Sequence, residues 1–326
     1  MGHGAWEAAL VNTCSPGNKV LMAETGTFSE QWKKMAEDLG LSVLYLPGDW
    51  RHGPNPDTVF DQLNQDKGHE IKAVAIVHNE TSTGVTTRLS EIRSAIDAAN
   101  HPALFLVDTI SSLASINFCM DEWKVDVAVG GSQKGLMLPP GLSFNGISEK
   151  AWSFSQSAQL PRRYWDWKAM MPDGKTPGFL STPATNMFFG LQASIQMIEE
   201  EGLNNVFDRH ARLAGAVRNA ISHWAEAGGL ELISEDPREH SNTVSAILLT
   251  KGHDADTLRA DCKYSSNVAL AAGLGQFSGK AFRIGHLGDL NEPMILGTLA
   301  AVEIALKKQG IPYQSGGTTA AIDYLS

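Results

Sequence analysis

Two ionisable side chains stand at the ends of apolar runs that are typical of buried strands. Asp108 lies near the end of ALFLVDT (103–109), and Lys134 follows VDVAVGG (125–131). A third apolar run, IKAVAIVHNE (71–80), also ends in polar residues. Because ligands bind at the carboxyl ends of parallel strands, we expect these polar side chains to meet at one ligand-binding edge.

A lysine beside a carboxylate suggests one particular chemistry. A neutral lysine amine condenses with an aldehyde to form an imine. A carboxylate at a pyridine nitrogen keeps that nitrogen protonated, so that the ring withdraws electrons from the substrate. Lys134 and Asp108 therefore favour a pyridoxal 5'-phosphate (PLP) site. The alternative is a pair of solvated loop charges, whose salt bridge would contribute little. Both interpretations stay open on these two residues alone.

Other catalytic motifs fail on spacing. In GGSQKGL (130–136), a glycine follows the lysine where a phosphate-binding loop needs Ser or Thr. The same segment has Lys134 where a nucleophile elbow needs its second glycine, so a hydrolase using Ser132 is a remote alternative. GLGQFSG (273–279) does not fit a dinucleotide fingerprint. The ten histidines show no HExxH spacing, and we expect no metal site.

Strand-like and helix-like segments alternate over the first two-thirds of the chain, which indicates an α/β fold with a mainly parallel sheet. After Gly202 the pattern changes to one long helical stripe, the strand-like TVSAILL and AFRIGHL, and a final helix from Pro293 to KKQG. The sequence therefore predicts a large domain over 1–202 and a smaller C-terminal α+β domain over 203–326.

The composition is that of a globular protein. The 326 residues are 43% hydrophobic and carry a formal charge of −10 without a basic cluster, which argues against a nucleic-acid partner. No apolar stretch reaches membrane-spanning length, so we expect no membrane association. Three widely spaced cysteines (Cys14, Cys119 and Cys262) suit a reducing, cytoplasmic compartment.

A phosphate needs an anion site. Gly2-His3-Gly4 precedes the helix-like segment AWEAALVN and offers free amides at a helix N-terminus. The alternative is a flexible terminus, which these residues alone favour.

Four ordered motifs carry a family resemblance: VHNETSTGV, VDTISSLAS, SQKGLMLPPGL and FRIGHLG. Together they resemble the class V aminotransferases of the PLP fold-type I superfamily, over residues 2 to 326. The resemblance implies a three-layer PLP-transferase fold and a homodimer with shared active sites. It implies transamination between a small amino acid, serine in the most similar members, and glyoxylate, giving hydroxypyruvate and glycine.

The resemblance also implies roles for residues at matching positions. Lys134 resembles the lysine that forms the imine with PLP, and Asp108 resembles the partner of the ring nitrogen. Gln133, Gly2 and His3 resemble ligands of the phosphate.

Four further positions match residues around the ring and the substrate. Thr81 matches a hydroxyl that reaches the ring oxygen, and Phe28 matches an aromatic that stacks on the ring; a core phenylalanine is the alternative. Thr182 matches a residue that reaches the phosphate of the neighbouring subunit. Arg283 resembles the arginine that binds the substrate carboxylate, for which its planar fork is suited. An edge-strand surface arginine is the alternative.

The chain departs from the family pattern in two places. It begins inside the phosphate motif, with Met1 where the family has serine, so we expect an N-terminal arm and the first elements of the large domain to be missing. The family often has Phe-Pro-Tyr-Thr where this chain has Phe-Leu-Ser-Thr (179–182). Three alternatives to the serine–glyoxylate reaction remain. Two are transamination of alanine or another small substrate, and an inactive truncated PLP-fold protein. The third, a cysteine desulfurase, is less favoured because Gln133 replaces the expected histidine.

Overall fold

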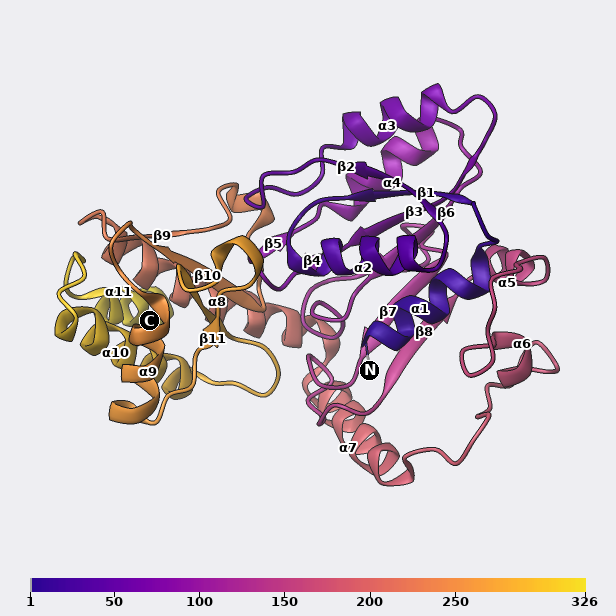
Figure 1. Cartoon of the computed structure of the whole chain (residues 1–326). Coiled ribbons are helices and arrows are strands. Elements are labelled where there is room, and N and C mark those ends of the chain that lie inside the picture. Colours follow the sequence, from indigo (N-terminus) through magenta and orange to yellow (C-terminus); the bar gives the residue numbers. More distant parts are fainter. Residues whose placement is uncertain (1) are drawn as a thin grey trace.

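The computed structural model describes residues 2–326, so that Met1 lies outside the described residues. A six-stranded sheet is built from the first part of the chain in the order β2-β1-β3-β6-β7-β8 (Figure 1). The first five strands in this order run parallel, and β8 is antiparallel to β7. The strands are β1 (Lys19–Ala23), β2 (Ser42–Leu46), β3 (Ile71–Val77), β6 (Leu104–Asp108), β7 (Val127–Gly131) and β8 (Ser143–Ile147).

Helices cover both faces of this sheet, because successive strand residues point to opposite sides and both sets are apolar. Val20 and Met22 of β1 face the core shared with α1 (Gly2–Thr13), α2 (Thr27–Asp38) and α5 (Glu149–Ser155). Leu21 and Ala23 face the core shared with α3 (Pro56–Gln65) and α4 (Leu89–Ala98). The three-layer α/β architecture predicted from the sequence is confirmed.

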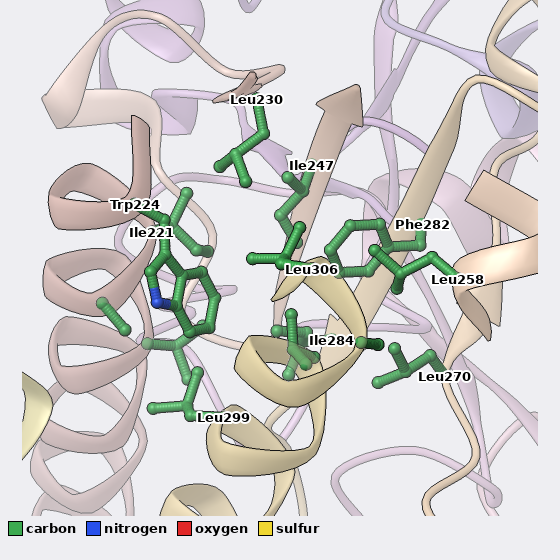
Figure 2. Close-up of a cluster of buried hydrophobic side chains, with 14 of the residues drawn as sticks. Ile221, Trp224, Leu230, Ile247, Leu258, Leu270, Phe282, Ile284, Leu299 and Leu306 are labelled. Atoms are coloured by element: carbon green, nitrogen blue, oxygen red, sulfur yellow. The ribbon is translucent and has the colours of Figure 1, made fainter. Parts of the chain in front are cut away.

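A second sheet is antiparallel, with four strands in the order β11-β12-β10-β9. Trp224 and Phe282 are fully buried in its core (Figure 2). The strands are β9 (Leu230–Leu232), β10 (Val244–Leu249), β11 (Ala271–Ala272) and β12 (Ala281–Gly285). The helices of this part of the chain are α8 (Leu203–Ala225), α9 (Ala255–Ser266), α10 (Glu292–Lys308) and α11 (Gly317–Leu325). Two short 3₁₀ turns are η1 (Pro237–Glu239) and η2 (Gly275–Phe277). The division of the chain at residue 202 stays a prediction.

Two sequence expectations about helices are wrong. The helix that ends at KKQG is not the last, because α11 follows it and packs on α8. Gly317 begins α11 so close to Trp224 that a side chain there would collide with the indole nitrogen. Gly2-His3-Gly4 does not precede the first helix but forms its first turn. The amides of that turn are still free of intrahelical bonds.

The segment between α5 and α8 is far more exposed than either sheet. It contains the short α6 (Trp167–Met170) and the long α7 (Thr185–Glu201), in which only Ser194 is buried. Within residues 2–326, no helix has the length and apolar character needed to cross a lipid bilayer.

Candidate active site

Three neighbouring parallel strands bring the predicted site residues together. Strand β6 lies between β3 and β7, and in the register Asp108 is paired with Val77 on one side and Val129 on the other. The residues that follow these strands therefore share one edge of the sheet. This edge carries Asp108, Thr81 in the turn of the hairpin β4 (Asn79–Glu80) and β5 (Val85–Thr86), and Lys134 after β7.

Asp108 is held in a buried environment. Its carboxyl is 5% exposed, and Oδ1 accepts a hydrogen bond of 2.7 Å from the Ile110 amide. Burial raises the pKa of Asp108 to about 7, and the nearby charge of Glu80 adds to the rise, while the Ile110 amide and Lys134 oppose it. Asp108 is therefore ready to pair with a positively charged group placed beside it.

The pKa of Lys134 is shifted in the opposite direction. Burial lowers the pKa of its amine, the positive charge of Arg283 lowers it further, and Asp108 opposes both. The neutral form, which is the nucleophile, is thereby favoured relative to a solvated lysine. Because both side chains are substantially removed from water, the alternative of two solvated loop charges does not hold.

Two features beside Lys134 fit a phosphate. Gln133 Oε1 is buried and has no hydrogen-bond partner within residues 2–326. Rotation about the last side-chain bond exchanges the amide oxygen and nitrogen, so the same position can present N–H donors. At the start of α1, a Cβ on Gly2 would lie 2.4 Å from Ile110 Cδ1, so α1 packs closely against the Asp108–Ile110 turn and a larger residue would displace the Ile110 side chain. The free amides of this helix end suit an anion.

The His3 side chain takes a different direction from Gly2. The His3 imidazole is exposed, and its Nε2 lies 3.0 Å from Gln31 Oε1. The part of His3 that belongs to the helix N-terminus is its backbone amide. Its role as a phosphate ligand stays a prediction, and the feature that suits this role is the amide rather than the ring.

Arg283 comes from the second sheet and reaches the same edge. It lies on β12, which is flanked by β10 and β11, so the alternative of an edge-strand surface arginine is wrong. The side chain is 9% exposed; Nε donates to the Ala272 carbonyl (2.8 Å) and Nη1 to the Thr81 carbonyl (2.7 Å). Among the described residues, Nη2 has no hydrogen-bond partner, which leaves one side of the fork for a ligand. Thr81 thus also acts through its backbone.

Glu80 lies at the edge predicted from the sequence, but its role could not be predicted. Its buried carboxylate accepts hydrogen bonds from the amides of Phe28 (3.2 Å) and Ser29 (3.1 Å) at the start of α2, and from the Ser82 hydroxyl (2.6 Å). A carboxylate is stabilising at a helix N-terminus. It fixes the turn that carries Phe28, which is half-buried and contacts Trp6 edge-on. Its position at the end of the apolar run 71–80 places Glu80 at this edge, but does not indicate the amides that it binds.

His78 and Asn79, which also end the apolar run 71–80, form buried polar contacts at this edge. Asn79 Nδ2 donates to Ser111 Oγ (2.8 Å) and to Thr243 Oγ1 (2.9 Å), and Thr243 precedes β10. His78 Nδ1 lies 2.9 Å from Ser112 Oγ, and burial lowers the His78 pKa to about 3, so this imidazole is neutral at physiological pH. These polar groups are buried and bonded to one another, which makes this edge rigid.

Thr182 is not brought to this site within one chain. It is exposed in the segment between α6 and α7. Its role toward a neighbouring subunit stays a prediction. No cluster of three or more His, Cys, Asp or Glu side chains in the described part of the chain is arranged to hold a metal ion.

The three-layer fold, with a lysine and a carboxylate at the carboxyl edge of its parallel sheet, defines a PLP-dependent enzyme of fold type I. The chain belongs to the class-V aminotransferase family, whose model matches residues 5–278. It is 45% identical to the serine–glyoxylate aminotransferase of Methylorubrum extorquens, over 99% of this chain and 81% of that protein.

Two further comparisons agree with this family assignment. The chain is 45% identical to the L-aspartate–glyoxylate aminotransferase of Paracoccus denitrificans, over 98% of this chain and 80% of that protein. The crystal structure of pyridoxamine–pyruvate aminotransferase from Mesorhizobium loti superposes with a TM-score of 0.90 at 27% identity, over 99% of this chain and 82% of that one. The protein is a PLP-dependent aminotransferase.

The raised pKa of Asp108 predicts an unusual stability profile for the cofactor-free protein. Between its ordinary value of 3.8 and about 7, folded Asp108 keeps a proton that the unfolded chain releases, so stability falls as pH rises through this range. Asp108→Asn removes this penalty. We expect its free energy of unfolding at pH 8 to exceed that of the wild type by on the order of 2 kcal/mol, with no gain at pH 4.

Urea unfolding at several pH values measures this difference. Asp173→Asn is the matched control, because two backbone amides lower the pKa of that exposed carboxyl to about 2 and its replacement should give no gain at pH 8. An Asp108→Asn protein that is no more stable than the wild type at pH 8 would contradict the raised pKa.

Proposed function

We propose that this aminotransferase transfers the amino group of a small amino acid, serine foremost, to glyoxylate, giving hydroxypyruvate and glycine. The observation that carries the proposal is the placement of Asp108 and Lys134 at the carboxyl ends of neighbouring parallel strands, at the edge where Arg283 binds the Thr81 carbonyl. The opposed directions of the Asp108 and Lys134 pKa shifts support it. The substrate pair is supported by the identity to the Methylorubrum extorquens enzyme. Aspartate as the amino donor is a second candidate, supported by the equally similar Paracoccus denitrificans enzyme.

Lys134 and Asp108 supply the chemistry that belongs to the chain. When bound, PLP supplies an electrophilic carbon for amines and a ring that accepts electrons from the substrate's α-carbon. Lys134 Nζ would hold the cofactor covalently and, once freed by the incoming substrate amine, would carry the proton between the substrate's Cα and the cofactor. Asp108 would stay ionised beside the ring nitrogen and keep it protonated. The attraction of that positive charge lowers the carboxyl pKa again.

Arg283 orients the substrate. Its fixed guanidinium, anchored on the Thr81 and Ala272 carbonyls, presents Nη2 to the substrate carboxylate. The Thr81 hydroxyl would serve the ring oxygen of PLP, and Phe28, in the turn held by Glu80, would lie against the ring.

The phosphate is held at the start of α1. The amides of Gly2 and His3 and the side-chain amide of Gln133 are the donors that serve it from this chain. With the side-chain amide turned over, the buried position that Gln133 Oε1 holds without a partner would present an N–H donor to the phosphate.

Lys134→Ala tests the covalent attachment. The wild-type protein should show a visible absorbance band with PLP that borohydride makes permanent at Lys134. In Lys134→Ala that band should be absent, and turnover should fall on the order of 10³-fold or more, because both the attachment and the proton transfer are lost. The exposed Lys124, replaced in the same way, should leave both unchanged.

The amino donor is settled by parallel assays with glyoxylate and serine, alanine or aspartate. Serine should give the highest kcat/KM, with hydroxypyruvate and glycine as products. A higher value with alanine or aspartate would replace serine in the proposal. A correctly folded wild type that stays colourless with added PLP would overturn the enzyme assignment for this chain.

We further propose a homodimer with shared active sites. Within residues 2–326, seven of the twelve exposed large apolar side chains fall between residues 164 and 203, namely Tyr164, Phe179, Leu180, Phe189, Ile195, Met197 and Leu203. Exposed apolar side chains gathered in one region mark interaction surfaces. Thr182 lies within this region, and in the dimer it reaches the phosphate site of the partner subunit.

Phe189→Glu tests the homodimer. Phe189 is 75% exposed on α7, and a charge there should oppose association and shift the protein to monomers in sedimentation experiments, with loss of turnover. Tyr264→Glu, at a side chain 78% exposed on α9, is the matched control and should leave the dimer intact. Equal sedimentation of the two variants would exclude this surface as the interface.

The remaining predictions concern organisation and location. We propose that residues 1–202 act as the large PLP-binding domain and 203–326 as the small domain. The three cysteines are all free, and a cytoplasmic location is proposed on that ground.

A further inference from the structure

Trp6 is fixed in an aromatic cluster on the α1 side of the sheet. Its indole ring stacks on that of Trp32 with centroids 5.7 Å apart and an interplanar angle of 15°. The Phe28 ring meets it edge-on at 6.3 Å, and the His3 ring lies 4.6 Å away. With only 1% of Trp6 exposed, this indole has little freedom to turn.

The Trp6 indole N–H is buried, so the group toward which it points determines whether it finds a hydrogen-bond partner. Trp6 Nε1 lies outside ordinary hydrogen-bond geometry with every acceptor in residues 2–326. A buried donor without a partner is costly, and Trp and Tyr polar atoms usually find a partner when buried. A polar group close to this N–H is therefore its natural partner in the working enzyme.

The α1 face that carries Trp6 packs against the turn that holds Asp108. Gly2 and Trp6 are four residues apart and lie on one helix face. Gly2 touches the Ile110 side chain, which packs on the same core cluster as Trp6, and the Ile110 amide binds Asp108 Oδ1. Burial, the largest cause, and the charge of Glu80 raise the pKa of Asp108. The Ile110 amide, the nearby Trp6 indole N–H and Lys134 lower it. Contacts that are long in a cofactor-free site tighten in the working complex.

We infer that Trp6 is a positioning residue for Asp108: its indole N–H donates to the carboxylate, and so keeps it ionised and directed at the cofactor's ring nitrogen. This inference rests on the proposed role of Asp108. It gives the buried N–H a function and extends the ring-nitrogen site from one residue to two. In this role the effect of Trp6 on the reaction passes through Asp108.

The chain provides a matched control. Trp32 belongs to the same stack, is fully buried, and its Nε1 also lacks a partner among the described residues. It lies on α2, however, whereas the helix that packs against the Asp108–Ile110 turn is α1. Trp6→Phe and Trp32→Phe each remove one buried N–H and keep an aromatic ring in the cluster. A purely structural role would therefore affect the two variants alike.

The test uses the PLP-loaded enzyme and the pH dependence of kcat/KM and of the absorbance of the bound cofactor. In Trp6→Phe, the acid limb should move to higher pH, with kcat/KM about three- to tenfold lower on that limb and near wild type at high pH. Trp32→Phe should keep the wild-type limb. Equal profiles for the two variants, shifted or not, would overturn the inference.

A second measurement tests the inference without the Trp6→Phe variant, in case that variant fails to fold. In wild-type holoenzyme with labelled tryptophan, the Trp6 indole N–H resonance is assigned through its contact with the His3 ring. It should shift markedly in Asp108→Asn, whereas an unchanged resonance would overturn the inference. A wild-type protein that binds no PLP would overturn the proposed function as well. If the wild type is active and coloured and the two variants have equal pH profiles, only the role of Trp6 is overturned.

Discussion

Removal of water from the carboxyl ends of β3, β6 and β7 is the constraint on which the rest of the site depends. Burial disfavours the charged form of every group there, so it raises the pKa of an acid and lowers the pKa of a base. It raises the pKa of Asp108 to about 7 and lowers that of Lys134. A carboxyl that is stabilised by a nearby positive charge and an amine whose neutral form is favoured are the two groups that a PLP site requires. Burial produces both properties.

The two sheets must stay together for this arrangement to hold. Arg283 crosses from β12 to the Thr81 carbonyl, and Asn79 crosses in the other direction to Thr243. Each crossing is buried and hydrogen-bonded, so a shift of one sheet against the other would leave polar groups unsatisfied. The substrate-binding role proposed for Arg283 is thus coupled to the same hairpin that places Thr81.

Much of the fold could be predicted from the sequence, because the buried parallel strands are apolar on both faces. KVLMA, for example, coincides with β1. Asp108 and Lys134 could be found because strand ends converge in such a sheet. Long-range partners could not be found: the amides that Glu80 caps are 51 or more residues away, and nothing local in VHNETSTGV points to them. The last helix, α11, was missed since it depends on packing against Trp224. The roles of Thr182, Phe28 and His3 rest on family resemblance alone.

The most direct test of the central claim is the pKa of Lys134 itself. In cofactor-free protein, the rate at which an amine-specific reagent modifies Lys134 can be followed by mass spectrometry across pH, with the exposed lysines as internal references. The account predicts an apparent pKa for Lys134 below the ordinary lysine value of 10.5. A midpoint at or above 10.5 would contradict it.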